Sequence, residues 1–258
     1  MKVGILGVGN MGGAIARSLM TRDDIELYLS NKDKDLSQYV GANVVDVTGI
    51  AKVDYLFLGV KPHIYPVVAE ELKGHLAPQT VVISIAAGMT FQKLAGMFPA
   101  QKLILSMPNT PAQVGYGMSA IAQNEYVTEA EFEIVRELFE GFGKVTELDE
   151  ALFDAFSACA GAMPAFVYMF IEAAGDGAVL SGIKRNEAYE FVAASVRGAA
   201  EMVLQTGCHP GVLKDQVTSP GGTTIEGVRA LEDGAFRSVV MDAVINACEK
   251  SKKMGEHA

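Results

Sequence analysis

Two glycine-rich stretches, one near each end of the chain, have the residue types and the spacing of anion-binding turns. The first follows a short apolar segment, residues 2–6, and opens a segment with helical spacing, residues 10–20. A G-x-G-x-x-G run in that context is typical of the turn that binds the pyrophosphate of a dinucleotide at a helix N-terminus. We expect its first glycine to make the tight turn, its second to admit the phosphates and its third to let helix and strand pack closely. Its residues are Gly7, Val8, Gly9, Asn10, Met11 and Gly12.

The second stretch is TSPGGTT, residues 218–224. Thr223 and Glu226 have the spacing of a capping box, which predicts a helix that begins at about Thr224. The glycines before it leave backbone N–H groups uncovered, and such a turn followed by a helix N-terminus binds an anion. Because the first turn already serves the cofactor phosphates, we predict a substrate carboxylate here, with the hydroxyl of Thr224 beside it. The alternative is an ordinary capped helix after a Gly-Gly turn.

Further candidate residues follow the predicted strands, where ligands of open α/β sheets bind. Ser30, Asn31 and Lys32 end the second strand and offer no acid for a ribose 2′-hydroxyl. Lys32 or Lys34 can supply positive charge, so NADP is favoured over NAD. These side chains could instead be ordinary turn residues, and Asp33 and Asp35 lie close by. The candidates at the other strand ends are Val60, Lys61, Pro62, Ala86, Ala87, Gly88 and Asn109.

Strands and helices alternate in the first part of the chain. Strands are predicted at 2–6, 25–30, 54–60, 80–85, 103–107 and 118–122, and helices at 10–20, 64–76 and 128–142, the last with a capping box at its start. This order predicts a Rossmann-like, doubly wound α/β sheet. From residue 150 only helices are predicted, at about 150–181, 186–206, 210–217, 223–233 and 236–254. We therefore expect a dinucleotide-binding domain, 1–149, followed by an all-helical domain, 150–258.

Composition narrows the class of protein. A net charge of −10 argues against a nucleic-acid surface. The three cysteines are scattered and show no metal-binding spacing, which predicts a reduced, cytoplasmic chain without a metal site. Residues 155–171 are 17 residues without a charge, the lower limit of a membrane span. Pro164 interrupts this segment and no second one exists, so we expect burial in an oligomer rather than in a membrane.

The predicted reaction is a reduction rather than an alcohol oxidation. Alcohol oxidation usually needs a base such as histidine or lysine. Residues 150–181, the first long helix after the sheet, contain no lysine. A protonated C=N bond accepts a hydride without a strong base, and a hydroxyl group is enough to orient its nitrogen.

The chain resembles the pyrroline-5-carboxylate reductases over essentially its whole length. Beside the first glycine run, the resemblance is carried by FLGVKP (57–62), IAAG (85–88), MPNTP (107–111) and, most specifically, residues 209–232. It implies an oxidoreductase acting on CH–NH groups that reduces 1-pyrroline-5-carboxylate to L-proline, the last step of proline biosynthesis. NADPH is the implied cofactor, with NADH as the alternative. The resemblance also implies a homodimer through the helical domain, which in many relatives assembles further into a ring of dimers.

The resemblance assigns roles to individual residues. Residues 7–12 would hold the pyrophosphate, Ser30 and Asn31 the adenosine end, and residues 60–62 and 86–88 the nicotinamide side, with Gln216 as a further cofactor contact. Thr224 would be the catalytic residue, hydrogen-bonded to the ring nitrogen. The implied substrate-binding residues are Glu150, Ser219, Gly221, Gly222, Thr223 and Thr224.

The chain departs from the family pattern at two places. Residues 160–166 read AGAMPAF where the family has SGSGPAY, so Met163 and Phe166 either narrow the imino acid pocket or repack a subunit contact. Asp46 stands in place of an asparagine near the adenosine, and its charge would disfavour a 2′-phosphate. Two alternatives therefore stay open: a reductase of a related cyclic imine such as piperideine-carboxylate, and a paralogue that binds NADP without turnover.

Overall fold

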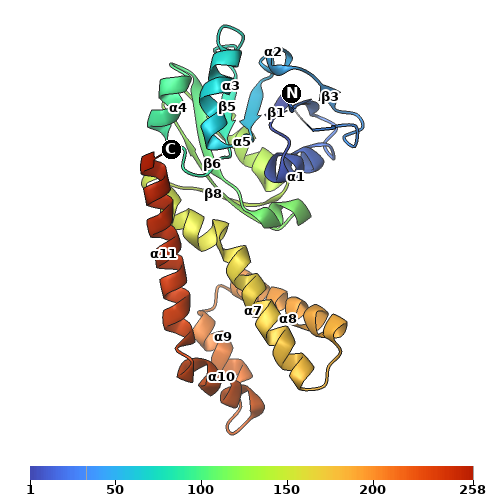
Figure 1. The fold of residues 1–258 in the computed structure, drawn as a ribbon, viewed down its shortest axis with the longest axis vertical. Coiled ribbons are helices and arrows are strands. Elements are labelled where there is room, and N and C mark those ends of the chain that lie inside the picture. The colour runs from blue at the N-terminus through green and yellow to red at the C-terminus, as the bar shows by residue number, and fades with distance from the viewer. Residues whose placement is uncertain (33, 258) are drawn as a thin grey trace. The chain divides into compact units, whose positions relative to one another are not determined.

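The computed structural model describes residues 1–32 and 34–257, and they form two compact units (Figure 1). One unit comprises Met1–Pro164 together with Asn246–Ala258, and the other comprises Ala165–Ile245. The first unit holds the whole sheet and the second is helical, which is the fold class that the sequence predicts.

The sheet of the first unit has eight strands in the order β3-β2-β1-β4-β5-β6-β7-β8. All neighbours are parallel except β6 and β7, which are antiparallel. The six predicted strands are present, whereas β3 and β8 were not predicted because neither is a continuous apolar run. The strands are β1 (Lys2–Leu6), β2 (Glu26–Ser30), β3 (Asn43–Val44), β4 (Tyr55–Leu58), β5 (Val81–Ser84), β6 (Lys102–Met107), β7 (Gly117–Gln123) and β8 (Gly143–Glu147).

Helices cover both faces of this sheet, because successive side chains of its buried strands point to opposite sides. Phe57 of β4 packs on one face with α1 (Asn10–Leu19) and α5 (Glu129–Glu140). Leu56 and Leu58 pack on the other face with α2 (Val47–Ile50), α3 (Tyr65–Leu72) and α4 (Phe91–Met97). The short helices α2 and α4 were not predicted, while α1, α3 and α5 were.

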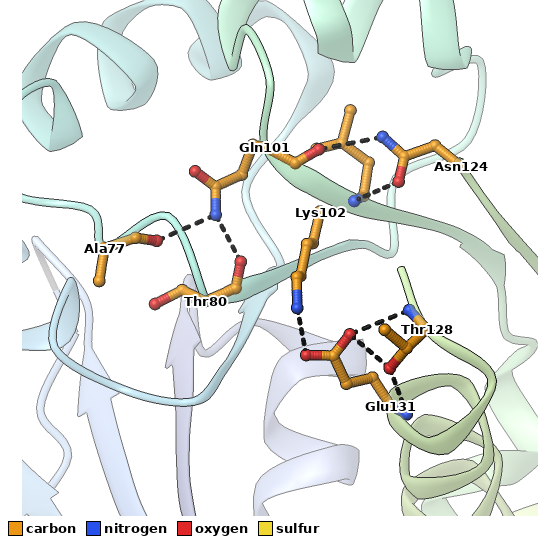
Figure 2. A network of polar contacts seen from close by, with 8 residues as sticks. Ala77, Thr80, Gln101, Lys102, Asn124, Thr128 and Glu131 are labelled. Carbon is orange, nitrogen blue, oxygen red and sulfur yellow. Dashed lines mark hydrogen bonds and ion pairs between the residues drawn. The ribbon is translucent and has the colours of Figure 1, made fainter. Parts of the chain in front are cut away.

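A polar network ties α5 to the sheet at the start of β6 (Figure 2). Glu131 accepts hydrogen bonds from the amide and the hydroxyl of Thr128 at 3.0 and 2.9 Å, which confirms the predicted capping box. The same carboxylate pairs with Lys102. Burial alone would raise the pKa of Glu131, but the bonds from Lys102 and Thr128 outweigh it and lower this pKa.

The chain leaves the sheet through a series of short helical segments. These are η3 (Glu150–Leu152), α6 (Phe153–Phe156) and the π-helical η4 (Ser157–Gly161), and α7 (Met163–Leu180) follows. Phe153 and Phe156 are buried in the core beneath the sheet. The π-helical segment closes with a bond from the amide of Ala162 to the carbonyl of Ser157 at 2.8 Å.

The helix predicted at about 150–181 is thus divided into η3, α6, η4 and α7, whereas the later helices lie in the predicted places. The second unit comprises the rest of α7, α8 (Arg185–Thr206), α9 (Pro210–Val217), α10 (Thr223–Asp233) and most of α11 (Phe236–His257). Its apolar side chains are widely exposed: Met169 is 70% and Leu180 is 90% exposed. By length and composition the helical run Glu150–Leu180 could cross a membrane, yet only 11% of its most apolar window is buried within the chain. This surface therefore requires a cover from outside the chain.

Candidate functional site

The first glycine run forms a tight turn from β1 into α1. Gly7 has a positive φ of 97°, and a Cβ on Gly12 would lie 2.3 Å from the Gly7 carbonyl oxygen. Both positions therefore admit glycine alone, which confirms the predicted turn and the close packing of helix on strand. Gly9 differs, since a Cβ there would meet nothing within 4 Å. The space beside Gly9 is thus open for a ligand.

The end of β2 holds this turn in place. The amide of Val8 donates to the side-chain oxygen of Asn31 at 2.9 Å, and the amide of Gly7 donates to the carbonyl of Ser30 at 2.9 Å. Lys34 donates from Nζ to the carbonyl of Val8 at 2.8 Å. Lys32 and Lys34 are both exposed, and of the two Lys34 reaches the turn. Asp33 lies outside the described residues.

Asp46 has a structural partner of its own. Its carboxylate caps α2 and accepts hydrogen bonds from the amide of Gly49 at 2.7 Å and from the hydroxyl of Thr48 at 2.9 Å. These bonds, the one from Gly49 first, lower the pKa of Asp46. The carboxylate is therefore charged at neutral pH, so a negative charge stands at the end of the strand next to β2.

The ends of β4 and β5 are fastened to each other by Tyr65. Its buried hydroxyl donates to the carbonyl of Leu58 and shares a second hydrogen bond with the hydroxyl of Ser84, both at 2.8 Å. Burial is the largest cause of its raised pKa. Beyond these strand ends lies an open groove of about 600 Å³. Three of the predicted cofactor-binding residues line it, Pro62, Ala87 and Gly88. Its other lining residues are His63, Pro66, Met89, Lys93, Met97 and Met254.

Lys93 holds the Gly88 loop and the C-terminal part of the chain at once. Its ammonium group donates to the carbonyl of Gly88 at 3.3 Å and also to the carbonyl of Gly255. Near the same end of α11, the hydroxyl of Ser251 donates to the Asp154 carboxylate at 2.6 Å. No periodicity or motif in the sequence pointed to either contact.

Two predicted site residues use their polar groups within the protein. Asn109 is 9% exposed; its Oδ1 accepts from the amide of Met118 at 2.9 Å and its Nδ2 donates to the carbonyl of Ala160 at 3.0 Å. Glu150 accepts a hydrogen bond from the amide of Phe91, the first residue of α4, at 2.8 Å. It lines a small cavity together with Gly88. Both residues thus lie beside the ends of β5 and β6, with part of their hydrogen-bonding capacity already taken.

In the second unit, residues 219–222 form a β-turn ahead of α10. The amide of Gly222 donates to the carbonyl of Ser219 at 3.0 Å, and Gly221 has a positive φ of 66° after Pro220, the arrangement of a type II turn. A Cβ on Gly222 would lie 2.3 Å from the hydroxyl oxygen of Ser219. Each position therefore requires glycine for a different steric reason. The Gly222 amide was expected to be uncovered, but it forms the hydrogen bond of the turn.

The predicted capping box of Thr223 and Glu226 is wrong. Gly222 is the N-cap of α10, so Thr223 is already the first helical residue and its hydroxyl caps nothing. The Glu226 carboxylate lies one position too far along and pairs with Arg229 at 3.1 Å instead. The first-turn amides of α10, those of Thr223 and Thr224 included, consequently have no side-chain cap.

The two glycine turns share one property. Helices α1 and α10 each begin at a glycine N-cap, Gly9 and Gly222, without a side-chain hydrogen bond to the first-turn amides. By contrast, Asp46, Thr90 and Thr128 cap α2, α4 and α5, while α3 and α8 start without a side-chain cap after residues other than glycine. Uncapped amides at the positive end of a helix dipole attract an anion. At α1 the open space beside Gly9 and the charge of Lys34 also fit a dinucleotide phosphate. Gln216 is exposed on α9.

Comparison with known proteins supports a single family over the whole chain. Pyrroline-5-carboxylate reductase from Escherichia coli (strain K12) is 41% identical over 99% of this chain and 98% of its own length. The chain belongs to the pyrroline-5-carboxylate reductase family. The corresponding protein from Arabidopsis thaliana is 37% identical over 99% of this chain and 96% of its own length. Residues 150–254 match the family described as pyrroline-5-carboxylate reductase dimerisation, and residues 2–88 match NADP oxidoreductase, coenzyme F420-dependent.

Solved structures of pyrroline-5-carboxylate reductases have the same fold. The crystal structure of the Plasmodium falciparum enzyme with NADP bound superposes with a TM-score of 0.90 at 33% identity, covering 99% of this chain and 98% of that one. The enzyme from Streptococcus pyogenes gives a TM-score of 0.88 at 32% identity, covering 98% of each chain. The departure at residues 160–166 spans the end of η4 and the start of α7, where Met163 is the first residue and Phe166 is half-buried.

Proposed function

We propose that this chain is a pyrroline-5-carboxylate reductase that uses NAD(P)H to reduce the C=N bond of 1-pyrroline-5-carboxylate to L-proline, the last step of proline biosynthesis. The observation that carries the proposal is the pair of uncapped helix starts, α1 and α10, in a chain of this family. One suits a dinucleotide phosphate and the other a small carboxylate.

The first unit is proposed to bind NADPH. Residues 7–12 would hold the pyrophosphate on the amides of α1, and Ser30, Asn31 and Lys32 would face the adenosine end together with Lys34. Residues 60–62 and 86–88 would line the nicotinamide side, with Asn109 behind them and Gln216 as a contact from α9. The NADP bound to the P. falciparum enzyme and the match of residues 2–88 support the choice of cofactor, with NADH as the weaker alternative.

The turn ahead of α10 is proposed to bind the substrate. The amides of Gly221 and Thr223 would hold the carboxylate, with Gly222 between them and Ser219 beside them. Glu150 is a further proposed substrate-binding residue. Thr224 is the proposed catalytic residue: its hydroxyl would hold and orient the protonated ring nitrogen. When bound, NADPH supplies the hydride that ends on C5 of the ring. No metal ion takes part in this scheme.

The helical domain, residues 150–258, is proposed to be the dimerisation domain, and residues 1–149 the dinucleotide-binding domain. The family match that begins at residue 150 supports this division. The exposed apolar side chains of α7 give a physical reason for a second subunit to bind there. A homodimer, assembled further into a ring of dimers, would bury these side chains between subunits. The protein is proposed to be cytoplasmic and to act without a membrane. The net charge of −10 also opposes nucleic-acid binding.

Steady-state kinetics of the purified protein test the proposal. NADPH oxidation should depend on 1-pyrroline-5-carboxylate, and in a competition at equal concentration this imine should be consumed ahead of piperideine-carboxylate. Thr224→Ala should lower kcat roughly a hundredfold, which is the size of effect typical of one general acid–base group. The Kd of NADPH should change little. Thr224→Ser keeps the hydroxyl and is the control. Tight NADPH binding without reduction of either imine would contradict the proposal.

A further inference from the structure

The carbonyl of Ala160 cannot accept the hydrogen bond that an α-helix supplies from the residue four positions later. In a continuous α-helix this carbonyl would accept from the amide of residue 164, four positions later. Residue 164 is a proline, which has no N–H. The π-helical segment Ser157–Gly161 ends here and α7 starts at Met163, so the missing bond falls at the break between two helical segments.

Asn109 supplies the missing donor from a distant part of the chain. Its Nδ2 donates to the carbonyl of Ala160 at 3.0 Å, across 51 residues of sequence. Among residues 1–32 and 34–257, this is the one side-chain hydrogen bond that the Ala160 carbonyl accepts. The other end of the amide accepts from Met118 at 2.9 Å, which fixes the side chain in the loop after β6. Asn109 is only 9% exposed, so water does not readily replace either bond.

We propose that Asn109 is a positioning residue that takes the place of the N–H absent from Pro164 and thereby locks the loop after β6 to the start of α7. Met107 at the end of β6 and Gly88 line the same small cavity, so this loop borders the residues proposed for the nicotinamide side. With the loop locked, the cavity wall is held in one position before the cofactor binds. This link to cofactor binding rests on the function proposed above, whereas the bond to Ala160 does not.

Asn124 offers a matched comparison within the same strand pair. Its Oδ1 accepts from the amide of Leu103 at 3.0 Å and its Nδ2 donates to the carbonyl of Gln101 at 3.0 Å, as Figure 2 shows. This amide therefore bridges two backbone groups in the same way as Asn109. It lies at the opposite end of β6, however, and neither partner involves a proline. Loss of its donor should cost stability without affecting the cofactor.

A double-mutant cycle tests the bond. Asn109→Asp keeps the acceptor for Met118 but loses the donor to Ala160, so it should lower the urea midpoint by about 0.5–1 M. Pro164→Ala restores an N–H at residue 164. In the wild-type background it should shift the midpoint by less than about 0.3 M, whereas in the Asn109→Asp background it should recover at least about half of the loss. When Pro164→Ala is combined with Asn124→Asp, the changes in the urea midpoint caused by the two substitutions should be additive.

NADPH binding separates positioning from mere stability. Asn109→Asp should raise the Kd of NADPH roughly tenfold at a temperature where the variant is fully folded, and Pro164→Ala should reverse most of this rise. Asn124→Asp should leave the Kd within about twofold of wild type. If Pro164→Ala shifts the urea midpoint equally in the wild-type and Asn109→Asp backgrounds, the proposed role of the bond to Ala160 is overturned. If Asn109→Asp and Asn124→Asp have equal Kd values for NADPH, the positioning role of Asn109 is overturned. If wild type fails to bind NADPH, the proposed function fails, while the urea cycle still decides the bond.

Discussion

The side-chain oxygen of Asn31 accepts a hydrogen bond from the backbone amide of Val8 at 2.9 Å. Lys34 binds the carbonyl of the same Val8 at 2.8 Å, so the end of β2 holds both polar groups of one residue in the glycine turn. The part of the chain expected to distinguish NADPH from NADH therefore also fixes the turn that would bind the pyrophosphate. Substitutions at Asn31 should weaken the binding of both NADPH and NADH rather than change the preference between them.

Gly9 and Gly12 should respond differently to the same substitution. Gly12→Ala places a Cβ 2.3 Å from the Gly7 carbonyl oxygen and should lower the free energy of unfolding by about 1–3 kcal/mol. Gly9→Ala meets no protein atom within 4 Å, so stability should stay nearly unchanged while NADPH binding is lost. Thermal unfolding and cofactor fluorescence titration measure the two effects. Unchanged NADPH affinity in Gly9→Ala would show that the open space is not the phosphate site.

Asp46→Asn should shift the cofactor preference towards NADPH. Asparagine is as good an N-cap as aspartate, so α2 should keep its start. Removing the charge should raise NADPH affinity about two- to fivefold at low ionic strength and leave NADH affinity unchanged, because only NADPH carries the 2′-phosphate. Titration with both cofactors at low and high salt checks this. An equal change for both cofactors would mean that Asp46 acts on the protein and not on the phosphate.

Lys93→Met should loosen the Gly88 loop and the end of α11 together. The ammonium group binds the carbonyls of Gly88 and Gly255, and no other side chain in the described residues donates to either. We expect a several-fold rise in the KM for NADPH and faster tryptic cleavage after Lys252 and Lys253. Lys73→Met, which removes an exposed pair with Glu70, is the matched control and should change neither. Ser251→Ala should speed cleavage while leaving the KM nearly unchanged.

Glu131 should contribute stability that depends on pH. Its pKa is lowered in the folded state, so its contribution is fully present above the unfolded-state pKa and is lost as the pH falls through the folded-state value. Glu131→Gln should cost about 1 kcal/mol at pH 7 and progressively less below pH 4. Glutamine can still accept from the amide of Thr128, so the cap itself persists. Urea unfolding of both proteins between pH 3 and pH 7 measures the difference, and parallel curves would contradict the expectation.

The sequence determined most of the helices and strands and the first glycine turn, because these follow from local patterns. Buried strands such as Tyr55–Leu58 are continuous apolar runs, and the box of Thr128 and Glu131 joins residues three apart. The same spacing misled at Thr223 and Glu226, because Gly222 took the N-cap position and moved every later residue by one. A spacing of three residues does not state where the helix begins.

The tertiary structure alone decided what Asn109 and Lys93 contact. In the sequence Asn109 is one polar residue among prolines at a strand end, which suggested a ligand contact. Its partner Ala160 is 51 residues away, and the need for that partner arises from Pro164, which cannot donate. Hydrogen bonds between distant backbone and side-chain groups leave no periodicity in the sequence, because they depend on how the strands and helices pack. Local chemistry thus fixed which groups this chain offers, and packing fixed which of them remain free to bind a ligand.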